Sequence, residues 1–424
     1  MKILIFLKWF FRAKYFWVFK NRTELLEHQN IQIKKYEKYL EEQQYQGKSV
    51  LADLKSSYLN KKIIQDNFEK FNAYGFNKNF CVAQAQKDES KVKEKSFSKD
   101  LSFGLSSGTS GSRSVFISSK KEQIIWAAII LAKMLPNKMI FQIFNPFSDK
   151  LHISLFLRAN NNLYRSINKF GLHLDFYDLN ENIEKSIDLI SNKKLDILVA
   201  PASVLLILAK KMEKQEIKIN PSLVISVAEV LEKKQYISEQ FKQIIHEIYQ
   251  CTEGFLAYTC KDGALHLNES FVKFNEKKID EKRFTPIITD FTRKSQFYVK
   301  YLHEDILVKG NICTCGDASM TLEKIEGRQD EILYFNDKVI FPDSIRKVFF
   351  NTKNEILNFS LKKKSNKLQI YLSPNKENTQ KEIVQGMNSL FKEYEVNFRE
   401  IEYEFFDYER NNYSIKNKRI INIE

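Results

Sequence analysis

Three thiols and one imidazole in the second half of the chain have the residue types of a metal site. Cys260 and His266 lie six residues apart, and Gly263 between them permits a turn. Cys313 and Cys315 form a Cys-x-Cys pair, which is also followed by a glycine. Three thiolates and one imidazole suit tetrahedral Zn²⁺, and four protein ligands leave no position open for water. The residues therefore predict a structural zinc site, with buried free cysteines and a surface histidine as the alternative.

A segment rich in serine and glycine, SSGTSGSRS at residues 106–114, has the composition of a phosphate-binding loop. Its glycines permit tight turns and a close approach of the backbone to a ligand. Successive backbone N–H groups in such a loop can hold phosphate oxygens. No Gly-Lys-Ser/Thr follows, so the segment is not a Walker A loop. A surface turn is the alternative interpretation.

Two later segments carry carboxylates beside aromatic or basic side chains. In YQCTEG, residues 249–254, Tyr249 offers a flat face to a base, and the Glu253 carboxylate suits Mg²⁺, which takes oxygen ligands. Asp305 ends the segment FYVKYLHED, and Arg328 lies in KIEGRQDEI. An aspartate can accept hydrogen bonds from ribose hydroxyls, and an arginine can bind phosphate oxygens. Each signal is weak alone.

The order of these segments is more informative than any one of them. The series is a Ser/Thr/Gly loop, an Ala-Glu pair, an aromatic-x-x-Thr-Glu, a basic-Tyr-x-x-x-Asp and a Gly-Arg-x-Asp. It resembles the adenylate-forming superfamily of acyl-CoA synthetases, and within it the phenylacetate–CoA ligase branch with its capsular-polysaccharide-type relatives. The resemblance covers about residues 60–424. It implies nucleotide binding by Ser107, Gly108, Thr109, Ser110, Gly111, Ala228, Glu229, Tyr249, Thr252, Asp305 and Arg328.

The resemblance also implies a role for each residue. Ala228 and Glu229 would border the adenine, and Tyr249 would stack on it. Thr252 would lie near the α-phosphate, and Glu253 would hold Mg²⁺. These two residues are expected to be catalytic. Asp305 would bind the ribose.

The end of the chain, IKNKRIINI, matches the closing segment of this branch. The match makes Lys416 the lysine that contacts the acyl phosphate and Asp330 the hinge before the last domain. A lysine-rich tail is the alternative for Lys416. The chain departs from the family at two positions, because Lys300 replaces an arginine and Ile415 replaces a glycine. Members of the branch with a similar Cys–His–Cys–Cys set support the zinc prediction.

The resemblance implies an AMP-forming ligase that uses ATP and Mg²⁺ to activate a carboxylic acid with release of pyrophosphate. The acyl group would then pass to a thiol of coenzyme A or of the phosphopantetheine of a carrier protein. Apolar runs at residues 152–166 and 204–209 favour an aryl or medium acyl acid. Two alternatives stay open. One is an adenylyltransferase that passes AMP to a coenzyme. The other is a degenerate, membrane-associated assembly protein of a surface-polymer pathway.

The elements that must position these residues alternate along the chain. LDILVAP (195–201) and PSLVISVAE (221–229) have strand character, and SVLLILAKKMEK (203–214) between them has helix character. FKQIIHEI (241–248) also suggests a helix. The pattern predicts an α/β fold with mixed or parallel sheets flanked by helices, a β-rich subdomain and a small mobile α+β domain. The expected divisions are a helical segment at 1–45, a large domain at 46–329 and a lid domain at 330–424.

Charge and cysteine content indicate where the protein works. The chain of 424 residues has a net charge of +14, but its acidic residues interleave with the lysines, so a nucleic acid partner is not expected. Five cysteines favour a reducing, cytoplasmic compartment over a disulfide framework. Residues 1–20 are apolar, aromatic and basic. They could contact the inner face of a membrane through Trp9, Phe10 and Trp17, but a helix that packs on the protein body is the favoured interpretation.

Overall fold

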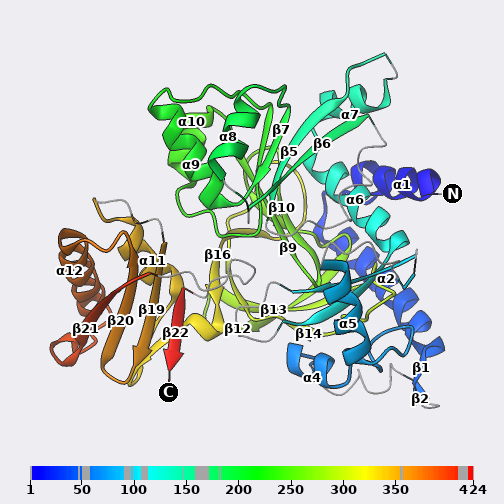
Figure 1. Ribbon diagram of the computed structural model, residues 1–424. Helices are drawn as coiled ribbons and strands as arrows, with labels where there is room; N and C mark the ends of the chain where they lie inside the picture. Colours follow the sequence, from blue (N-terminus) through cyan, green and yellow to red (C-terminus); the bar gives the residue numbers. More distant parts are fainter. Residues whose placement is uncertain are drawn as a thin grey trace.

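The computed structural model describes residues 2–45, 48–49, 58–89, 97–98, 100–106, 113–145, 147–157, 171–179, 181, 183–353, 356, 358–408 and 419–423. Within these residues a twelve-stranded sheet passes through the body of the protein, and a four-stranded sheet forms near the C-terminus (Figure 1). Helices flank both sheets. The predicted fold class is confirmed: a large α/β part with mixed sheets, a β-rich part and a small α+β part.

One half of the large sheet is parallel. Its strands lie in the order β6 (Leu172–Asp178), β5 (Leu151–Leu157), β7 (Ile197–Ala200), β8 (Leu223–Ser226) and β9 (Ile245–Cys251). Strands β7 and β8 read ILVA and LVIS, the continuous apolar runs that strands covered on both faces require. The crossovers contain α8 (Ile183–Ser191), α9 (Ala202–Glu213) and α10 (Lys234–Phe241).

The other half of the sheet is antiparallel. From β9 it continues through β10 (Gly254–Thr259), β11 (Leu265–Leu267), β16 (Thr321–Arg328), β15 (Asp305–Lys309), β13 (Arg283–Asp290) and β12 (Val272–Lys278), and β14 (Tyr301–Leu302) pairs with β13. Strand β9 therefore belongs to both halves, because it runs parallel to β8 and antiparallel to β10. Tyr249, Asp305, Arg328, the Thr-Glu pair and the four predicted zinc ligands lie on this half and its loops.

One expected helix is wrong. Residues 241–248 do not continue a helix, because α10 ends at Phe241 and Lys242 takes a left-handed conformation with φ of 55°. Strand β9 then begins at Ile245. Short apolar runs do not distinguish a helix from a strand by periodicity alone, and here pairing with β8 and β10 decides the structure. The Thr-Glu segment thus follows a strand.

The N-terminal elements pack on this sheet. They are α1 (Lys2–Phe11), the π-helical turn η1 (Arg12–Phe16), α2 (Arg22–Glu42), β1 (Gln44–Tyr45), β2 (Lys48–Ser49), α4 (Lys61–Asp66), α5 (Lys78–Glu89), β3 (Leu101–Leu105), β4 (Val115–Ser119), α6 (Lys120–Met134) and α7 (Asn137–Phe144). Helix α1 lies against α6 and buries Phe6 and Phe10. Helix α2 forms hydrogen bonds with residues that are distant in sequence: Gln29 donates to Glu269 O at 2.9 Å, and Tyr36 donates to Arg293 O at 2.6 Å.

The last part of the chain has its own apolar core. Its sheet has the order β21 (Glu402–Asp407), β20 (Lys367–Ser373), β19 (Asn358–Lys364) and β22 (Ile420–Ile423). The flanking elements are η3 (Gln329–Glu331), β17 (Leu333–Phe335), β18 (Lys338–Ile340), α11 (Pro342–Phe350), α12 (Glu377–Glu393) and η4 (Phe398–Glu400). Leu361, Ile370, Ile383 and Phe391 meet in this core.

Gly327 marks the contact between the last part and the body. A Cβ at this position would lie 2.9 Å from atoms of Pro342 and of Arg346, so no larger residue fits. Arg346 also donates to Glu326 O at 2.7 Å and pairs with Glu232. Helix α11 is therefore seated directly on strand β16. Among the described helices, none combines the length and apolar character needed to cross a bilayer.

Candidate nucleotide and metal sites

Two of the predicted segments meet at one edge of the parallel half-sheet. Strands β8 and β9 are parallel and in register from Val224 opposite Ile245, so their carboxyl ends share an edge. Ala228 and Glu229 follow β8, and the Thr-Glu pair follows β9. Ligands in α/β folds commonly bind beyond the carboxyl ends of such strands. The topology brings these residues together although more than twenty positions separate them.

A hydrogen-bonded cluster surrounds Glu253. Thr252 Oγ1 donates to Glu253 Oε2 at 2.8 Å, and Tyr301 Oη donates to Oε1 at 3.0 Å. His303 Nε2 lies 3.9 Å from Oε2. The Tyr249 hydroxyl donates to the Asp305 carboxylate and lies 3.3 Å from His303 Nδ1. Three predicted residues, Thr252, Glu253 and Asp305, thus belong to one network.

The surroundings keep the Glu253 carboxylate ionised. Burial acts to raise its pKa, but the charge of His303 and the hydrogen bond from Thr252 outweigh burial, so the pKa lies below the ordinary value for glutamate. Burial raises the pKa of Tyr249 well above that of free tyrosine, and the neighbouring Asp305 charge adds to the effect. The network therefore holds an ionised carboxylate beside a neutral phenol that donates a hydrogen bond. Such a carboxylate suits a magnesium ion.

Arg293 fixes the backbone on which Thr252 and Glu253 stand. Its side chain is fully buried, with Nη1 donating to Thr252 O at 3.0 Å and Nη2 donating to Ile117 O at 3.1 Å. The guanidinium lies over the rings of Trp126 and Tyr298, at 4.7 and 5.2 Å from their centroids. A buried cation that makes such contacts orders its surroundings. Arg293 therefore joins strand β4 and helix α6 to the Thr-Glu turn.

Glu122 completes this support from the start of α6. It forms a capping box with Ser119, and it also accepts hydrogen bonds from the backbone N–H groups of Lys294 and Ser295. Burial acts to raise the pKa of Glu122, but the charge of Arg293 and the hydrogen bonds from Ser295 and Ser119 outweigh it and lower the pKa. Loop residues 292–296 are thereby held against the first turn of α6.

The buried carboxyl group of Asp290 should make the stability of the protein depend on pH. Burial raises the pKa of Asp290 to about 6 despite its hydrogen bonds from Thr292. The folded state therefore binds a proton that the unfolded state releases at lower pH. Stability is unaffected below the unfolded pKa and falls as the pH rises toward 6. A difference of about two pKa units corresponds to about 3 kcal/mol.

We therefore expect Asp290→Asn to cancel this part of the pH dependence. Urea unfolding of both proteins between about pH 4 and pH 7 provides the measurement. The free energy of unfolding of the wild type relative to Asp290→Asn should fall by about 3 kcal/mol as the pH rises through this window. A constant difference between the two proteins would show that Asp290 is ionised throughout.

Asp305 and Arg328 face each other across paired strands. They are register partners in the β15–β16 ladder. Arg328 pairs with Glu304 and, at 3.0 Å, with Asp330, which lies in the short helix η3. The predicted hinge residue thus touches the predicted nucleotide-binding arginine. The last part of the chain is linked by this pair to the strand that carries Asp305.

Glu229 is placed at a helix terminus as well as at the sheet edge. Its carboxylate accepts a hydrogen bond from Ser203 N, in the first turn of α9, at 3.0 Å. Ala228 beside it adopts a left-handed φ of 65°, a conformation that is rare for residues other than glycine. Arg419 of the last part is partly buried, and the loss of solvent lowers its pKa, while the charge of Glu229 acts in the opposite direction. A cation of the C-terminal part therefore stands near Glu229.

The remaining nucleotide-site predictions fall outside the described residues. They are the phosphate loop, with Ser107, Gly108, Thr109, Ser110 and Gly111, and the catalytic Lys416. The described neighbours show where both segments start and end. Ser106 N donates to Ser114 O at 2.7 Å across the base of the loop, and Arg113 Nε donates to Ser106 O at 2.9 Å. Tyr408 and Arg419 are the described residues on either side of the segment that contains Lys416.

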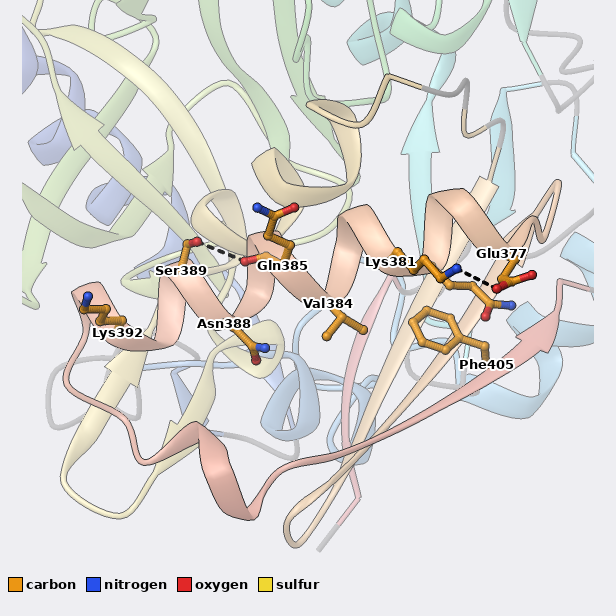
Figure 2. A pocket seen from close by; sticks show the side chains of 9 residues that line it. Glu377, Lys381, Val384, Gln385, Asn388, Ser389, Lys392 and Phe405 are labelled. Carbon is orange, nitrogen blue, oxygen red and sulfur yellow. Dashed lines mark hydrogen bonds and ion pairs between the residues drawn. The ribbon is translucent and has the colours of Figure 1, made fainter.

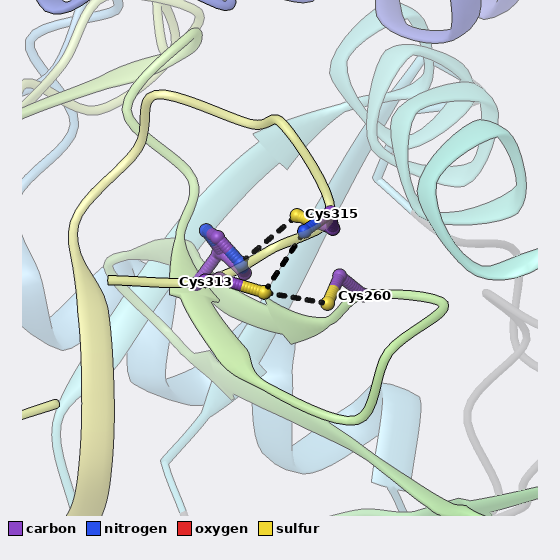
Figure 3. Close-up of side chains that lie close together, drawn as sticks. Cys260, Cys313 and Cys315 are labelled. Atoms are coloured by element: carbon purple, nitrogen blue, oxygen red, sulfur yellow. Dashed lines mark hydrogen bonds between the residues drawn. The ribbon is translucent and has the colours of Figure 1, made fainter. Parts of the chain in front are cut away.

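The four predicted zinc ligands come together. Their sulfur and nitrogen atoms all lie within 4.8 Å of one another. Cys260 Sγ lies 3.7 Å from Cys313 Sγ, and Cys315 Sγ lies 3.4 Å from His266 Nε2 (Figure 3). A tetrahedral ion with bonds of about 2.3 Å to sulfur separates two sulfurs by about 3.8 Å. The donor set and its spacing therefore fit Zn²⁺.

Local backbone structure prepares these ligands. His266 Nδ1 lies 3.0 Å from Ser319 O, an acceptor, so Nδ1 carries the proton and Nε2 is free to bind a metal. The Cys315 N–H points to Cys313 Sγ, and the Asp317 N–H points to Cys315 Sγ, both at 3.4 Å. Gly263 and Gly316 take positive φ values of 87° and 85°, which allow the two tight turns.

A polar chain lies beside the metal ligands. Lys133 of α6 donates to the Tyr258 hydroxyl at 3.0 Å, and Tyr258 donates to the Asp317 carboxylate at 2.5 Å. Burial lowers the pKa of Lys133, while the charges of Asp317 and Cys315 act to keep it protonated. Three thiolates around a divalent ion leave one net negative charge. The ammonium of Lys133 is placed to balance that charge.

An open groove of about 740 Å³ lies elsewhere, on helix α12 (Figure 2). An ion pair between Lys381 and Glu377 at 2.7 Å crosses its wall. None of the groove's lining residues is a predicted site residue. They are Glu377, Gln380, Lys381, Val384, Gln385, Asn388, Ser389, Lys392 and Phe405. The groove is a shallow face of a helix rather than a place for the expected chemistry.

Most of the apolar run at residues 204–209 belongs to the core of the protein. Val204, Leu205, Leu208 and Ala209 are buried in the core between α9 and the parallel strands. Their apolar character is explained by helix packing on a sheet. The run therefore gives no information about the acid. Of the other run, only residues 152–157 are described, and they form most of β5.

Several residues of the site had no role in the sequence predictions. His303 had a recoverable signal, because it alternates with Tyr301 and Asp305 in an extended segment and so shares their face. Arg293 and Lys133 had no such signal in the sequence. Each reaches its partner from a distant element, and only the folded chain brings Arg293 to Thr252 or Lys133 to Tyr258.

Comparison with solved structures finds the same fold in several ligases and synthetases. No family model matches the sequence, and no curated protein does. The structure is similar to 2-hydroxyisobutyryl-CoA ligase in the postadenylation state, in complex with 2-HIB-AMP. The TM-score is 0.60 at 12% identity, over 100% of this chain and 89% of that chain. Similarity extends to the GH3.15 acyl acid amido synthetase, with a TM-score of 0.51 at 12% identity over 85% and 81% of the two chains.

A third similar structure is ATP-bound MatB from Rhodopseudomonas palustris. The TM-score is 0.51 at 12% identity, over 73% of this chain and 65% of that chain. At these identities the similarity establishes the shared fold. The chemistry has to be argued from the residues themselves.

Proposed function

We propose that the protein activates a carboxylic acid with ATP, releases pyrophosphate and passes the acyl group to a thiol. The observation that carries this proposal is the Glu253 network. A buried, ionised carboxylate stands beside Tyr249 and Asp305 at the carboxyl edge of parallel strands, in a fold shared with ligases that bind acyl adenylates. Sites of this kind are preorganised for charged phosphates and their counterions.

In the first step, a carboxylate oxygen of the acid attacks the α-phosphorus of ATP. The new P–O bond forms as the bond to pyrophosphate breaks, so negative charge moves onto the leaving group. A magnesium ion held by Glu253 would neutralise part of this charge. Thr252 would orient Glu253, and its backbone is fixed by Arg293. Asp305 would accept hydrogen bonds from the ribose hydroxyls, with Tyr249 holding its carboxylate in place.

In the second step, a thiolate of coenzyme A or of a carrier phosphopantetheine attacks the acyl carbon, and AMP leaves. We propose that the last domain, residues 330–424, turns about Asp330 between the steps, removing Lys416 and admitting the thiol. The separate core of that region and the short helix η3 at the junction support this motion. The large domain would comprise residues 46–329, with residues 1–45 as a helical addition.

The zinc site belongs to the same proposal as a structural element. Cys260, His266, Cys313 and Cys315 would hold one Zn²⁺ with no position left for water. The ion would fasten the β10–β11 turn to the loop between β15 and β16. It would stabilise the part of the sheet that carries Asp305 and Arg328, without taking part in the reaction.

An exchange assay tests the proposed reaction. Labelled pyrophosphate should enter ATP only when a suitable acid is present, and a panel of aryl and medium-chain acids, which we propose as the substrate class, is the first choice. Release of AMP that depends on coenzyme A then distinguishes thiol transfer from transfer of AMP to a coenzyme. Exchange with none of the acids, under conditions in which the protein binds ATP, would contradict the ligase proposal.

A further inference from the structure

The outer face of the N-terminal helices is strongly apolar. Helix α1 buries Phe6 and Phe10 against the body but leaves Leu4 71% exposed and Phe11 half exposed. In the adjoining turn, Phe16 is 71% exposed. The residues expected at a membrane from sequence therefore turn inward, with Trp9 packed on Phe271. A different set of residues faces outward.

A second element extends this face. Helix α7 and the residues after it expose Phe141, Phe144 and Phe147, the last at 96%. Phe144 connects the two elements, since its ring stacks on that of Phe11 with centroids 6.4 Å apart. We call Leu4, Phe11, Phe16, Phe141, Phe144 and Phe147 the aromatic patch. Proteins that stay in water rarely keep so many large apolar side chains uncovered on neighbouring elements.

The two segments that carry the aromatic patch hold basic side chains and no acidic ones. Residues 2–20 contain five basic and no acidic side chains, and residues 137–147 add one lysine and no acid. Lys2, Lys8 and Lys138 are exposed. Asp149, the nearest acidic residue after α7, pairs with Lys194 at 3.2 Å. A basic rim around an apolar face complements an anionic surface.

The same charges argue against a second copy of the chain as the occupant. Two copies that met through this face would bring like charges together around a low-dielectric contact, which is unfavourable. An acidic bilayer surface satisfies both features at once, because the apolar side chains enter the acyl boundary and the lysines meet lipid phosphates. We propose that the aromatic patch docks the protein onto an anionic membrane surface, with α1 and α7 lying in the interface.

The packing of α1 explains why such docking needs no refolding. Lys14 donates to Leu135 O at 2.8 Å, and the guanidinium of Arg12 lies over the rings of Trp9 and Trp17, 5.3 and 5.2 Å from their centroids. The helix is fixed to the body by these contacts, so its outer face is presented in advance. A preorganised surface loses less conformational entropy when it binds.

Sedimentation of the full-length protein with lipid vesicles tests this proposal. Binding is expected to vesicles with about one third phosphatidylglycerol, but not to pure phosphatidylcholine, and should weaken as salt rises. Phe141→Ser with Phe147→Ser should reduce the partition coefficient at least about tenfold. Both side chains are exposed, so folding should be unchanged. Lys8→Glu with Lys138→Glu should remove the preference for the anionic lipid.

A matched control removes apolar side chains from other surfaces. Leu189→Ser with Tyr334→Ser replaces two half-exposed residues far from the patch in sequence, and vesicle binding should equal that of the wild type. Three results would overturn the proposal. They are no sedimentation with anionic vesicles, equal binding by the Phe141→Ser/Phe147→Ser variant, and a dimer in solution that these two substitutions dissociate.

Discussion

Replacement of Glu253 by glutamine is expected to lower acid-dependent pyrophosphate exchange by about 100- to 1000-fold. The substitution keeps the shape of the side chain, and an amide oxygen can still accept from Thr252 or Tyr301. It removes the negative charge that a magnesium ion requires. The loss should therefore appear in the chemical step, and the protein should unfold at nearly the same temperature as the wild type.

Binding measurements separate this role from a general loss of structure. Calorimetric titration of the wild type with ATP should show tighter binding when Mg²⁺ is present, and Glu253→Gln should lose most of that dependence. Glu247→Gln is the matched control, because Glu247 lies on β9, the strand that precedes Glu253, and its carboxylate pairs with Lys234 at 2.8 Å. Equal exchange rates for Glu253→Gln and the wild type would contradict the assigned role.

Loss of the zinc ligands is expected to have the largest effect on stability. Replacement of Cys260 and Cys313 by serine should reduce bound zinc from about one ion per chain to almost none. A ligand present at about 1000 times its Kd stabilises a folded protein by about 4 kcal/mol. For a chain of this size the substitution should lower Tm by roughly 5 °C. Elemental analysis and thermal unfolding give the two measurements.

A neighbouring substitution controls for disturbance of the loop. Thr314 is exposed and lies between the two cysteines of the pair. Within the described part of the chain, its side chain hydrogen-bonds only to Asp262. Thr314→Ala should keep the metal and the unfolding temperature. A strong chelator should destabilise the wild type and Thr314→Ala but leave Cys260→Ser/Cys313→Ser unaffected. If all three proteins contain no zinc and unfold together, the four residues are not a metal site.

The sequence was most informative where chemistry itself restricts the residue types. Three cysteines and a histidine have few common roles, so Cys260, His266, Cys313 and Cys315 could be grouped before their distances were known. Thr252, Glu253 and Asp305 were grouped by their order in the chain, and the structure brings them into one network. The alternating α/β pattern was also readable, because apolar periodicity reflects which face of an element is buried.

The sequence was less informative where the answer depends on distant contacts. Residues 241–248 looked helical, yet hydrogen bonds to β8 and β10 make the second half of them a strand. The sequence around Arg293 does not indicate its role, because its hydrogen-bond acceptors, Thr252 O and Ile117 O, lie 41 and 176 positions away. The apolar residues of α9 suggested a substrate pocket because burial in a core and contact with an apolar ligand require the same side chains.

The long reach of helix α2 has a consequence for how the chain folds during synthesis. Its partners are made late, because Tyr36 bonds to Arg293 O and Gln29 to Glu269 O, about 250 positions further on. A ribosome that adds about 5 to 20 residues per second needs roughly 10 to 50 s to supply them. During that time the part of the sheet on which the inner faces of α1 and α2 pack has not yet been synthesised. Helix α2 therefore reaches its final position only after these later residues have been made.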